Sequence, residues 1–213
     1  MKQKIFFTTL FIFLGTIAFC SEVIHFSADR MSGITSETSD YTKLEGNAKI
    51  QTNSLEISAE TIELSGEDFR HIKATGNVSG FHKEENLKFS CAEMQYDRQL
   101  KTALFVGSVH LVDNENDVIA DAERINYNEE TGIAHMQINV KLVQKDSLCT
   151  CAFAIYRKKQ QLLEMSGNPQ IVRGDDTFRA QEITFNLETE AITLDGRVRG
   201  TVTEESTTKK ETN

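Results

Sequence analysis

An internal repeat of about thirty residues is the feature that most constrains how this chain can fold. One column of the repeat holds glycines that follow an apolar alternation, with Ile138 in the place of the fourth glycine. A second column holds small residues at similar intervals. Two columns that keep step over six copies predict stacked, equivalent structural units. The columns are Gly46, Gly76, Gly107, Ile138, Gly167 and Gly196, and Ala28, Ala59, Cys91, Ala122, Ala152 and Ala180.

The residues around each glycine alternate between apolar and polar side chains, as in the segment I-K-A-T-G-N-V at 72–78. A period of two is typical of a β-strand with one buried face. The pattern places the glycine column on the apolar face. A glycine there removes a side chain where backbones or a ligand come close.

The apolar phase changes by one position next to each small residue. In the segment 55–64 the apolar residues are odd-numbered up to Ala59 and even-numbered from Ile62, and later copies repeat this switch. A regular strand cannot keep one face buried through such a slip, but a β-bulge can, because it adds one residue and bends the strand. We therefore expect each repeat to contain two strand arms that meet at a corner, with polar turns between the arms.

Six such units predict an all-β fold, namely an elongated open β-jelly roll or β-solenoid-like stack with two facing antiparallel sheets. If each repeat adds one strand spacing, the stack is about 29 Å long. The jelly-roll domain is expected over residues 21–200, followed by a polar flexible tail over 201–213.

The first twenty residues have the pattern of a secretory signal peptide. Two lysines precede an apolar run that is short for a membrane span, and the small residues Ala18 and Cys20 suit cleavage before Ser21. Acylation of Cys20 is the alternative, but bulky Phe19 stands where a lipoprotein signal carries a small residue. We therefore predict export to the periplasm by a cleavable signal at 1–20.

The charge of the chain argues against nucleic acid as a partner. The formal net charge is −9. Loss of residues 1–20 would remove two lysines and no acids, which makes the remaining chain more acidic still. Such a chain is a poor candidate for binding polyanions or anionic membrane surfaces.

No catalytic, metal or cofactor site is predicted. The acidic pairs at 84–85 and 175–176 fall in turns and are expected to be solvated rather than to act as acid and base. Cys91 is expected to be a small buried apolar residue, and a Cys91–Cys151 disulfide remains open. The histidines share no metal-ligand spacing and are expected to be solvated or incidental. They are His25, His71, His82, His110 and His135.

Two short sequence boxes alternate behind the signal peptide. One places a small residue before an acid, as in F-S-A-D-R-M at 26–31, I-S-A-E-T-I-E-L at 57–64 and A-D-A-E-R-I-N-Y at 120–127. The other follows a glycine, as in L-E-G-N-A-K-I at 44–50, A-T-G-N-V at 74–78, F-V-G-S-V at 105–109 and M-S-G-N-P at 165–169. Over residues 25–200 this alternation resembles the OstA-like family, the periplasmic bridge protein, or A component, of the lipopolysaccharide-transport machinery. The pattern departs from the family at Ile138 and at A-F-A-I, 152–155.

The resemblance implies a twisted, V-shaped open jelly roll whose interior holds lipid acyl chains, without catalytic residues. It implies lipopolysaccharide or a related glycolipid as ligand. It also implies end-to-end stacking between an inner-membrane-anchored transport component and an outer-membrane β-barrel component. The edges near His25–Met31 and Ala191–Val198 are the expected contacts of this head-to-tail self-association, because exposed strand edges pair with other chains.

An apolar trough that shields acyl chains is the expected binding site, since each buried methylene contributes about 0.8 kcal/mol. Periodicity alone favours a sealed core that binds nothing, whereas the family resemblance favours the trough. The residues expected to line it are Ile57, Ile62, Phe89, Met94, Phe105, Val109, Leu111, Ile125, Tyr127, Ile138, Ile155, Ile183 and Phe185.

Two other functions stay open. A structural or adhesive surface β-solenoid with a dry core would give no lipid adduct. The membrane-anchored inner-membrane partner of the same transport system would keep its N-terminal anchor, but the short apolar run before Ser21 favours the soluble member. A carbohydrate-active β-helix enzyme would need acids stacked on adjacent rungs, which the repeat does not offer.

Overall fold

The computed structural model describes residues 23–36 and 39–203. The predicted signal peptide at 1–20 and residues 204–213 of the predicted tail lie outside the described residues. The strands are β1 (His25–Ser27), β2 (Arg30–Ser36), β3 (Ser39–Gln51), β4 (Leu55–Ser65), β5 (His71–His82), β6 (Leu87–Asp97), β7 (Thr102–Asp113), β8 (Val118–Asn128), β9 (Ile133–Gln144), β10 (Ser147–Arg157), β11 (Leu162–Ser166), β12 (Gln170–Arg173), β13 (Asp176–Arg179), β14 (Glu182–Asn186), β15 (Ile192–Asp195) and β16 (Arg199–Thr201); two 3-10 turns are η1 (Glu67–Phe69) and η2 (Lys158–Gln160).

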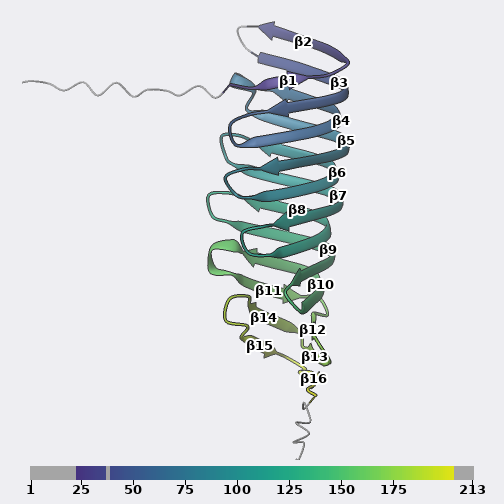
Figure 1. Ribbon diagram of the computed structural model, residues 1–213, viewed down its shortest axis with the longest axis vertical. Coiled ribbons are helices and arrows are strands. Elements are labelled where there is room, and N and C mark those ends of the chain that lie inside the picture. Colours follow the sequence, from purple (N-terminus) through teal and green to yellow (C-terminus); the bar gives the residue numbers. More distant parts are fainter. Residues whose placement is uncertain (1–22, 37–38, 204–213) are drawn as a thin grey trace, which may run out of the picture.

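All of these strands belong to one antiparallel sheet that is open at both ends. From β3 to β10 each strand pairs with the next one along the chain, and Figure 1 shows the resulting elongated stack. After β10 the sheet divides, because β12 pairs with the first half of β10 and β11 with its second half. The predicted fold class, an elongated open all-β fold, is confirmed; its two facing layers are the two arms of one sheet.

The expected length of about 29 Å is wrong. Each repeat contributes two consecutive antiparallel strands, such as β4 and β5, rather than one strand spacing. The main path of the sheet runs through twelve strands, from β1 to β15. At the usual separation of neighbouring strands this path spans about 50 Å.

The two repeated columns lie side by side at a corner in the middle of the long strands. Pairing of β5 with β6 is regular up to Thr75 opposite Glu93 and resumes with Val78 opposite Cys91. Two residues of β5 therefore oppose one of β6, which is the arrangement of a β-bulge. The same two-to-one shift occurs between β3 and β4, β7 and β8, and β9 and β10. The bulge predicted at this corner is confirmed, but its extra residue lies on the glycine-bearing strand and not beside the small residue.

The glycine column faces the outside of this corner. Gly76 and Asn77 have φ angles of 79° and 47°, and this left-handed backbone is open chiefly to glycine and, at lower frequency, to asparagine. A Cβ built on Gly107 (φ 82°) would lie only 2.8 Å from the Cβ of Ala92 on the neighbouring strand. At Gly76 the contact would be with the exposed Glu60 side chain. The expectation of an inward-facing glycine column is therefore wrong.

Ile138 stands at the glycine position of the fourth copy and adopts the same left-handed backbone, with a φ of 65°. Its side chain is 53% exposed. A β-branched residue is strained in this region of backbone space.

Replacing Ile138 with glycine is therefore expected to raise the free energy of unfolding by about 1 kcal/mol, because the left-handed strain of an L-residue is removed. Urea denaturation measures the difference. The matched control is Ile119→Gly in β8, where the backbone is regular and the exposed isoleucine has no such strain; this change is expected to lower stability. A loss of stability in Ile138→Gly as large as in the control would contradict the strain.

The turns between the long strands form two rows, one along the end of each arm. A straight strand as long as β8 would keep its ends about 33 Å apart. Tyr127 near the end of β8 nevertheless bonds to Glu85, which belongs to the row of turns at the other end of the strands. The strands therefore bend enough to bring the two rows together. The first row contains residues 52–54, 83–86, 114–117 and 145–146, and the second row contains residues 66–70, 98–101, 129–132, 158–161 and 187–191.

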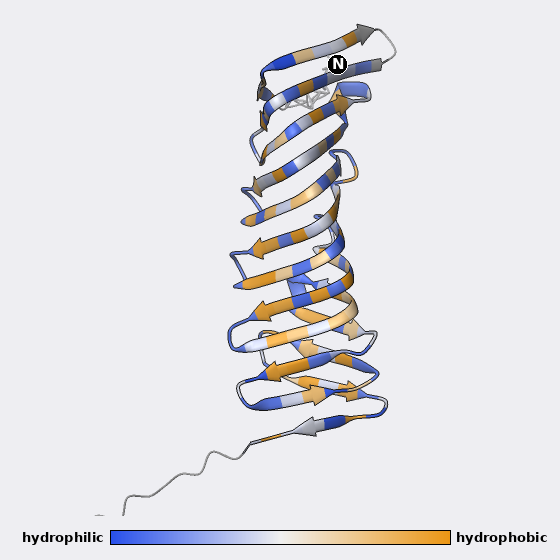
Figure 2. Cartoon of the chain, turned by 90° about the vertical axis from the view of Figure 1, so that its right-hand side faces the viewer, coloured by the Kyte–Doolittle hydropathy of each residue, from blue (hydrophilic) through white to orange (hydrophobic). Residues whose placement is uncertain are grey.

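The core fills the space between the two arms. Inward residues alternate with outward polar ones along each strand, and Figure 2 shows the corresponding alternation of hydropathy along the ribbons. Phe105 and Phe185 are among the largest fully buried side chains, and the rings of Phe89 and Phe105 lie 4.9 Å apart. Burial of each such side chain stabilises the fold by about 1.5–3 kcal/mol.

Candidate functional site

Most residues expected to line a trough do face the space between the arms. Their side chains are at most 7% exposed and pack in one continuous apolar cluster. This cluster runs along the stack from β3 to β14 and follows the long axis of the molecule. The residues are Ile57, Ile62, Phe89, Met94, Phe105, Val109, Leu111, Ile125, Tyr127, Ile183 and Phe185.

The predicted positions of Ile138 and Ile155 are wrong. Ile138 lies on the exposed outside of the corner, as described above. In β10 the pairing with β9 shifts by one residue between Cys151 and Phe153, so Ala154 and Tyr156 turn inward and are buried. Ile155 therefore points outward, where it is half-buried.

The interior includes further apolar residues that were not proposed from the sequence. Met136 and Leu142 lie on the apolar alternation that runs through Ile138, so the sequence carries a signal for their burial. The others follow the same inward phase on their strands. They are Leu44, Ile50, Leu64, Ile72, Val78, Val140, Leu163, Met165 and Ile171.

The interior is closed in this structure. Beneath the meeting of the two rows lies an apolar cavity of about 30 Å³, bordered by Leu111, Ile125 and Met136. This volume is about the share of one water molecule in the liquid. An acyl chain can therefore enter at this point of the stack only if the two arms move apart.

A polar seam joins the two rows of turns above this interior. At its centre is Lys158, whose side chain is only 8% exposed. Its Nζ donates to the backbone oxygen of Glu85 at 2.7 Å and to the Glu85 carboxylate at 3.0 Å. The carboxylates of Glu115 and Asp113 lie 3.0 and 3.7 Å from the same nitrogen.

Donors and acceptors at the centre of the seam are divided between the rows. The hydroxyl of Tyr127 donates to the Glu85 carboxylate at 3.0 Å, and that of Tyr156 donates to Asp113 at 3.4 Å. The side-chain amide of Gln161 donates to Asn116 at 2.9 Å. The acids lie in or beside the first row, whereas Lys158 and the other donors lie in or beside the second.

The protonation states suit this division. Burial alone would raise the pKa of Glu85, but the hydrogen bond and charge of Lys158 bring that pKa below its ordinary value. Burial would lower the pKa of Lys158, yet the hydrogen bonds to Glu85 and Glu115 raise it. Burial, followed by the nearby carboxylates, raises the pKa of Tyr127 and of Tyr156. At neutral pH the tyrosines therefore remain hydrogen-bond donors.

The seam continues on both sides of Lys158. His82 is only 7% exposed, so the expectation that it is solvated is wrong. Its Nδ1 accepts the backbone N–H of Glu85, and its Nε2 lies 3.4 Å from Glu129 across the seam. Towards the C-terminal end, Lys145 pairs with Glu190 at 2.9 Å. Glu85 is expected to be a solvated acid in a turn, but its carboxylate is bonded to Lys158 and only 27% of its side chain is exposed.

Nearer the N-terminal end the two rows border a cleft of about 300 Å³. Thr52 to Leu55 line it from the first row, and Arg98 and Lys101 line it from the second. Ile72, a residue of the interior, also borders the cleft. The separation between the rows therefore varies along the stack.

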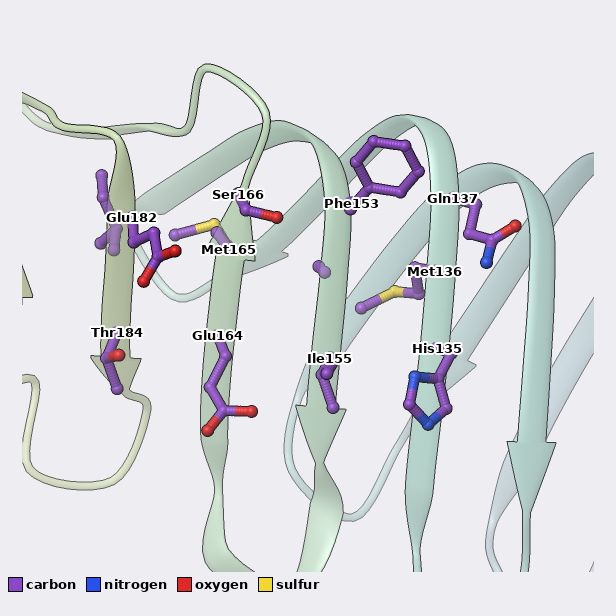
Figure 3. Close-up of a pocket in the computed structure, with 12 residues that line it drawn as sticks. His135, Met136, Gln137, Phe153, Ile155, Glu164, Met165, Ser166, Glu182 and Thr184 are labelled. Carbon is purple, nitrogen blue, oxygen red and sulfur yellow. The ribbon is translucent and has the colours of Figure 1, made fainter.

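A second depression lies on the outer face of the sheet, with a volume of about 400 Å³ (Figure 3). It crosses β9, β10, β11 and β14, and its lining includes His135, Phe153, Glu164 and Thr184. Phe153 is 52% exposed, and Glu164 pairs with Arg157 at 3.0 Å. The depression is shallow and lies on the opposite side of the sheet from the apolar interior.

The described residues show no other arrangement suited to bound metal or reactive thiols. Within 23–36 and 39–203, no group of three or more histidine, cysteine or acidic side chains is placed to hold a metal ion. Cys91, Cys149 and Cys151 are free thiols, so no Cys91–Cys151 disulfide is present. Burial raises the pKa of Cys149 to about 12, which keeps it an unreactive thiol. The described residues also include no helix that is long and apolar enough to cross a membrane.

Within residues 23–36 and 39–203, both ends of the sheet present strands with a free edge. At the N-terminal end β2 pairs with β3 alone, and its side chains Met31 and Ile34 are 54% and 69% exposed. At the C-terminal end β15 pairs with β14, and β16 pairs with β13. Such edges offer unpaired backbone groups to another strand.

The central and C-terminal strands resemble a known protein family. Residues 89–191 match the family model described as LptA/(LptD N-terminal domain) LPS transport protein. No curated protein matches the chain. Among solved structures, the chain is similar to LptH from Pseudomonas aeruginosa, described as the LptA homologous periplasmic component of the conserved lipopolysaccharide transport device. The identity is 8%, the match covers 85% of this chain and 96% of that chain, and the TM-score is 0.27. The family-model match over residues 89–191 covers just under half of the chain.

Proposed function

We propose that this chain shields the acyl chains of lipopolysaccharide or a related glycolipid in the periplasm. The match of residues 89–191 to the model of the lipopolysaccharide-transport family supports this role. It would act as one part of a bridge between the inner and outer membranes. No chemical step is required, because transfer of a lipid along a shielded path breaks no bond. Any energy for transport would come from a partner.

The observation that carries this proposal is the uninterrupted apolar interior along the stack. It extends from Leu44 in β3 to Phe185 in β14 without a change of chemical character. In the described part of the chain, every buried side-chain nitrogen or oxygen has a hydrogen-bond partner, so the interior presents no unpaired polar side-chain atom to a lipid. Each methylene moved from water into such a space contributes about 0.8 kcal/mol.

The open ends support the bridging role. A strand edge on one copy can pair with the opposite edge of the next copy, and head-to-tail contacts of this kind extend without closing. The N-terminal edge lies within the segment His25–Met31 and β2, and the C-terminal edge includes β15. We propose that these edges contact further copies, an inner-membrane-anchored transport component and an outer-membrane β-barrel component.

Photo-crosslinking from the two faces of the sheet tests the lipid-binding proposal. A benzoylphenylalanine probe in place of Phe89, which is 5% exposed and faces the interior, is expected to capture lipopolysaccharide. The same probe in place of Phe153, which is 52% exposed on the outer face, is the matched control and is expected to capture little. Adducts are identified by gel shift and mass spectrometry. Equal capture from both positions, or none from Phe89, would refute the proposal.

A dry structural core is the second candidate function, and the closed interior favours it. A cavity of about 30 Å³ holds no acyl chain. A surface or adhesive β-solenoid would keep this closed state under all conditions. The Phe89 probe separates the two candidates, because a permanently closed core gives no glycolipid adduct.

A further inference from the structure

The centre of the seam joins residues that are far apart in the chain. Lys158 and Glu85 are separated by 73 residues, and Tyr127 and Glu85 by 42. Their bonds therefore hold together turns at the ends of different strands rather than neighbours along one strand. At Lys158 the first row supplies the negative charge and the second row the positive charge, so this pairing attracts one arm to the other.

These bonds close the interior on the side where the two rows of turns meet. Lys158, Asp113 and Tyr156 border the small cavity together with apolar residues such as Leu111 and Ile125. An acyl chain that occupies this part of the interior must separate the rows at this point. The bonds of Lys158 across the seam then have to break.

The polar contacts between the two rows can open reversibly. Glu115 is 64% exposed and Glu85 is 27% exposed at the side chain, so water can reach both carboxylates as the rows part. Hydrated charges can replace paired ones at a modest net cost, since protein–water bonds are exchanged for protein–protein bonds. A seam of apolar side chains would instead expose apolar surface to water on opening.

We infer that Lys158, with Glu85, Asp113 and Glu115, forms a clasp whose opening sets how fast acyl chains enter the middle of the interior. This inference rests on the proposed lipid-binding function. It assigns Lys158 a positioning role: the residue acts by holding the arms together, not by binding the lipid headgroup.

Two neighbouring lysines provide the test and its control. Lys158→Met keeps a similar unbranched side chain and removes the charge that crosses the seam. Lys159→Met removes an exposed lysine whose Nζ bonds to the backbone oxygen of Glu130 within the same row. Glu115→Gln weakens the clasp at its most exposed member and serves as a second, milder variant.

The first measurement is the distance between the rows without lipid. Spin labels are placed at Glu84→Cys and Gln160→Cys, which are exposed positions in opposite rows, after Cys91, Cys149 and Cys151 are replaced by alanine. Double electron–electron resonance is expected to show a longer or broader distance distribution in Lys158→Met, a smaller change in Glu115→Gln, and none in Lys159→Met. An unchanged distribution in a folded Lys158→Met variant would overturn the clasp.

The second measurement is the rate at which lipopolysaccharide with a fluorescent acyl chain is taken up. Lys158→Met is expected to load at least about tenfold faster than the wild type, the factor that corresponds to 1.4 kcal/mol. Lys159→Met is expected to load at the wild-type rate. Faster loading in both variants, or wild-type loading in a Lys158→Met variant with separated rows, would overturn the gating role. If no variant takes up lipid, the proposed function fails, while the distance measurement still reports on the clasp.

Discussion

Replacing Phe105 with alanine is expected to lower the free energy of unfolding by about 3–5 kcal/mol, the range for removal of a large buried aromatic side chain. Phe105 is 2% exposed, lies at the centre of the stack and packs its ring 4.9 Å from that of Phe89. Its removal leaves a cavity between two arms that belong to one sheet. The neighbouring strands can collapse only partly, because their backbone hydrogen bonds fix their spacing.

Urea denaturation followed by circular dichroism measures this loss. Phe153→Ala is the control, since this phenylalanine is 52% exposed on the outer face and its removal is expected to change stability by no more than about 0.5 kcal/mol. A similar loss in the two variants would mean that the space between the arms is not the core of the fold.

Introducing two lysines on the N-terminal edge is expected to abolish head-to-tail self-association. Met31→Lys and Ile34→Lys place charge on β2, whose outer edge has no partner strand among the described residues. Charged side chains on an edge strand oppose pairing with another chain. Both positions are more than half exposed, so the monomer should keep its fold. The dissociation constant is expected to rise at least about 100-fold, which corresponds to about 2.8 kcal/mol.

Sedimentation velocity over a range of protein concentrations measures the assembly. The control is Ile119→Lys, which adds a charge at a partly exposed position on β8, in the middle of the sheet and away from both edges. Unchanged assembly in the β2 variant, or an equal loss in the β8 variant, would show that the N-terminal edge is not the contact.

The fold could be predicted from the sequence because the phase switch in each repeat marks the corner of the sheet. The phase switch at Ala59 and its counterparts indicates a bulge, and the structure has one at this corner, with the extra residue on the neighbouring glycine-bearing strand. The direction of the glycine column did not follow. In β5 two residues, Gly76 and Asn77, oppose one residue of β6. Ala74 and Val78 both stay inward, so the alternation in the sequence continues unbroken through Gly76. The sequence pattern is the same for an outward and an inward glycine, and the positive φ angles of the structure distinguish them.

The assignment of Ile155 failed for a related reason. Apolar residues occupy both faces of β10, with Phe153 and Ile155 outward and Ala154 and Tyr156 inward. Hydrophobic periodicity then does not indicate which residues of β10 face inward. Pairing with β9 decides which of them are buried.

The clasp was outside the reach of sequence patterns. Turn residues such as Glu85 and Lys158 are typical of solvated loops, and their contact depends on how two bent arms meet over 73 residues of chain. A charged group becomes buried here because tertiary structure brings a partner of opposite charge to it.

The most direct test of the central claim is paramagnetic broadening of isoleucine methyl signals by lipopolysaccharide that carries a nitroxide on one acyl chain. The interior isoleucines Ile62, Ile125 and Ile183 are at most 1% exposed, whereas Ile119 and Ile138 are 39% and 53% exposed on the outside. If acyl chains occupy the space between the arms, the three interior signals broaden and the two outer signals stay sharp. Sharp interior signals at saturating lipid, or broadening confined to Ile119 and Ile138, would contradict the account.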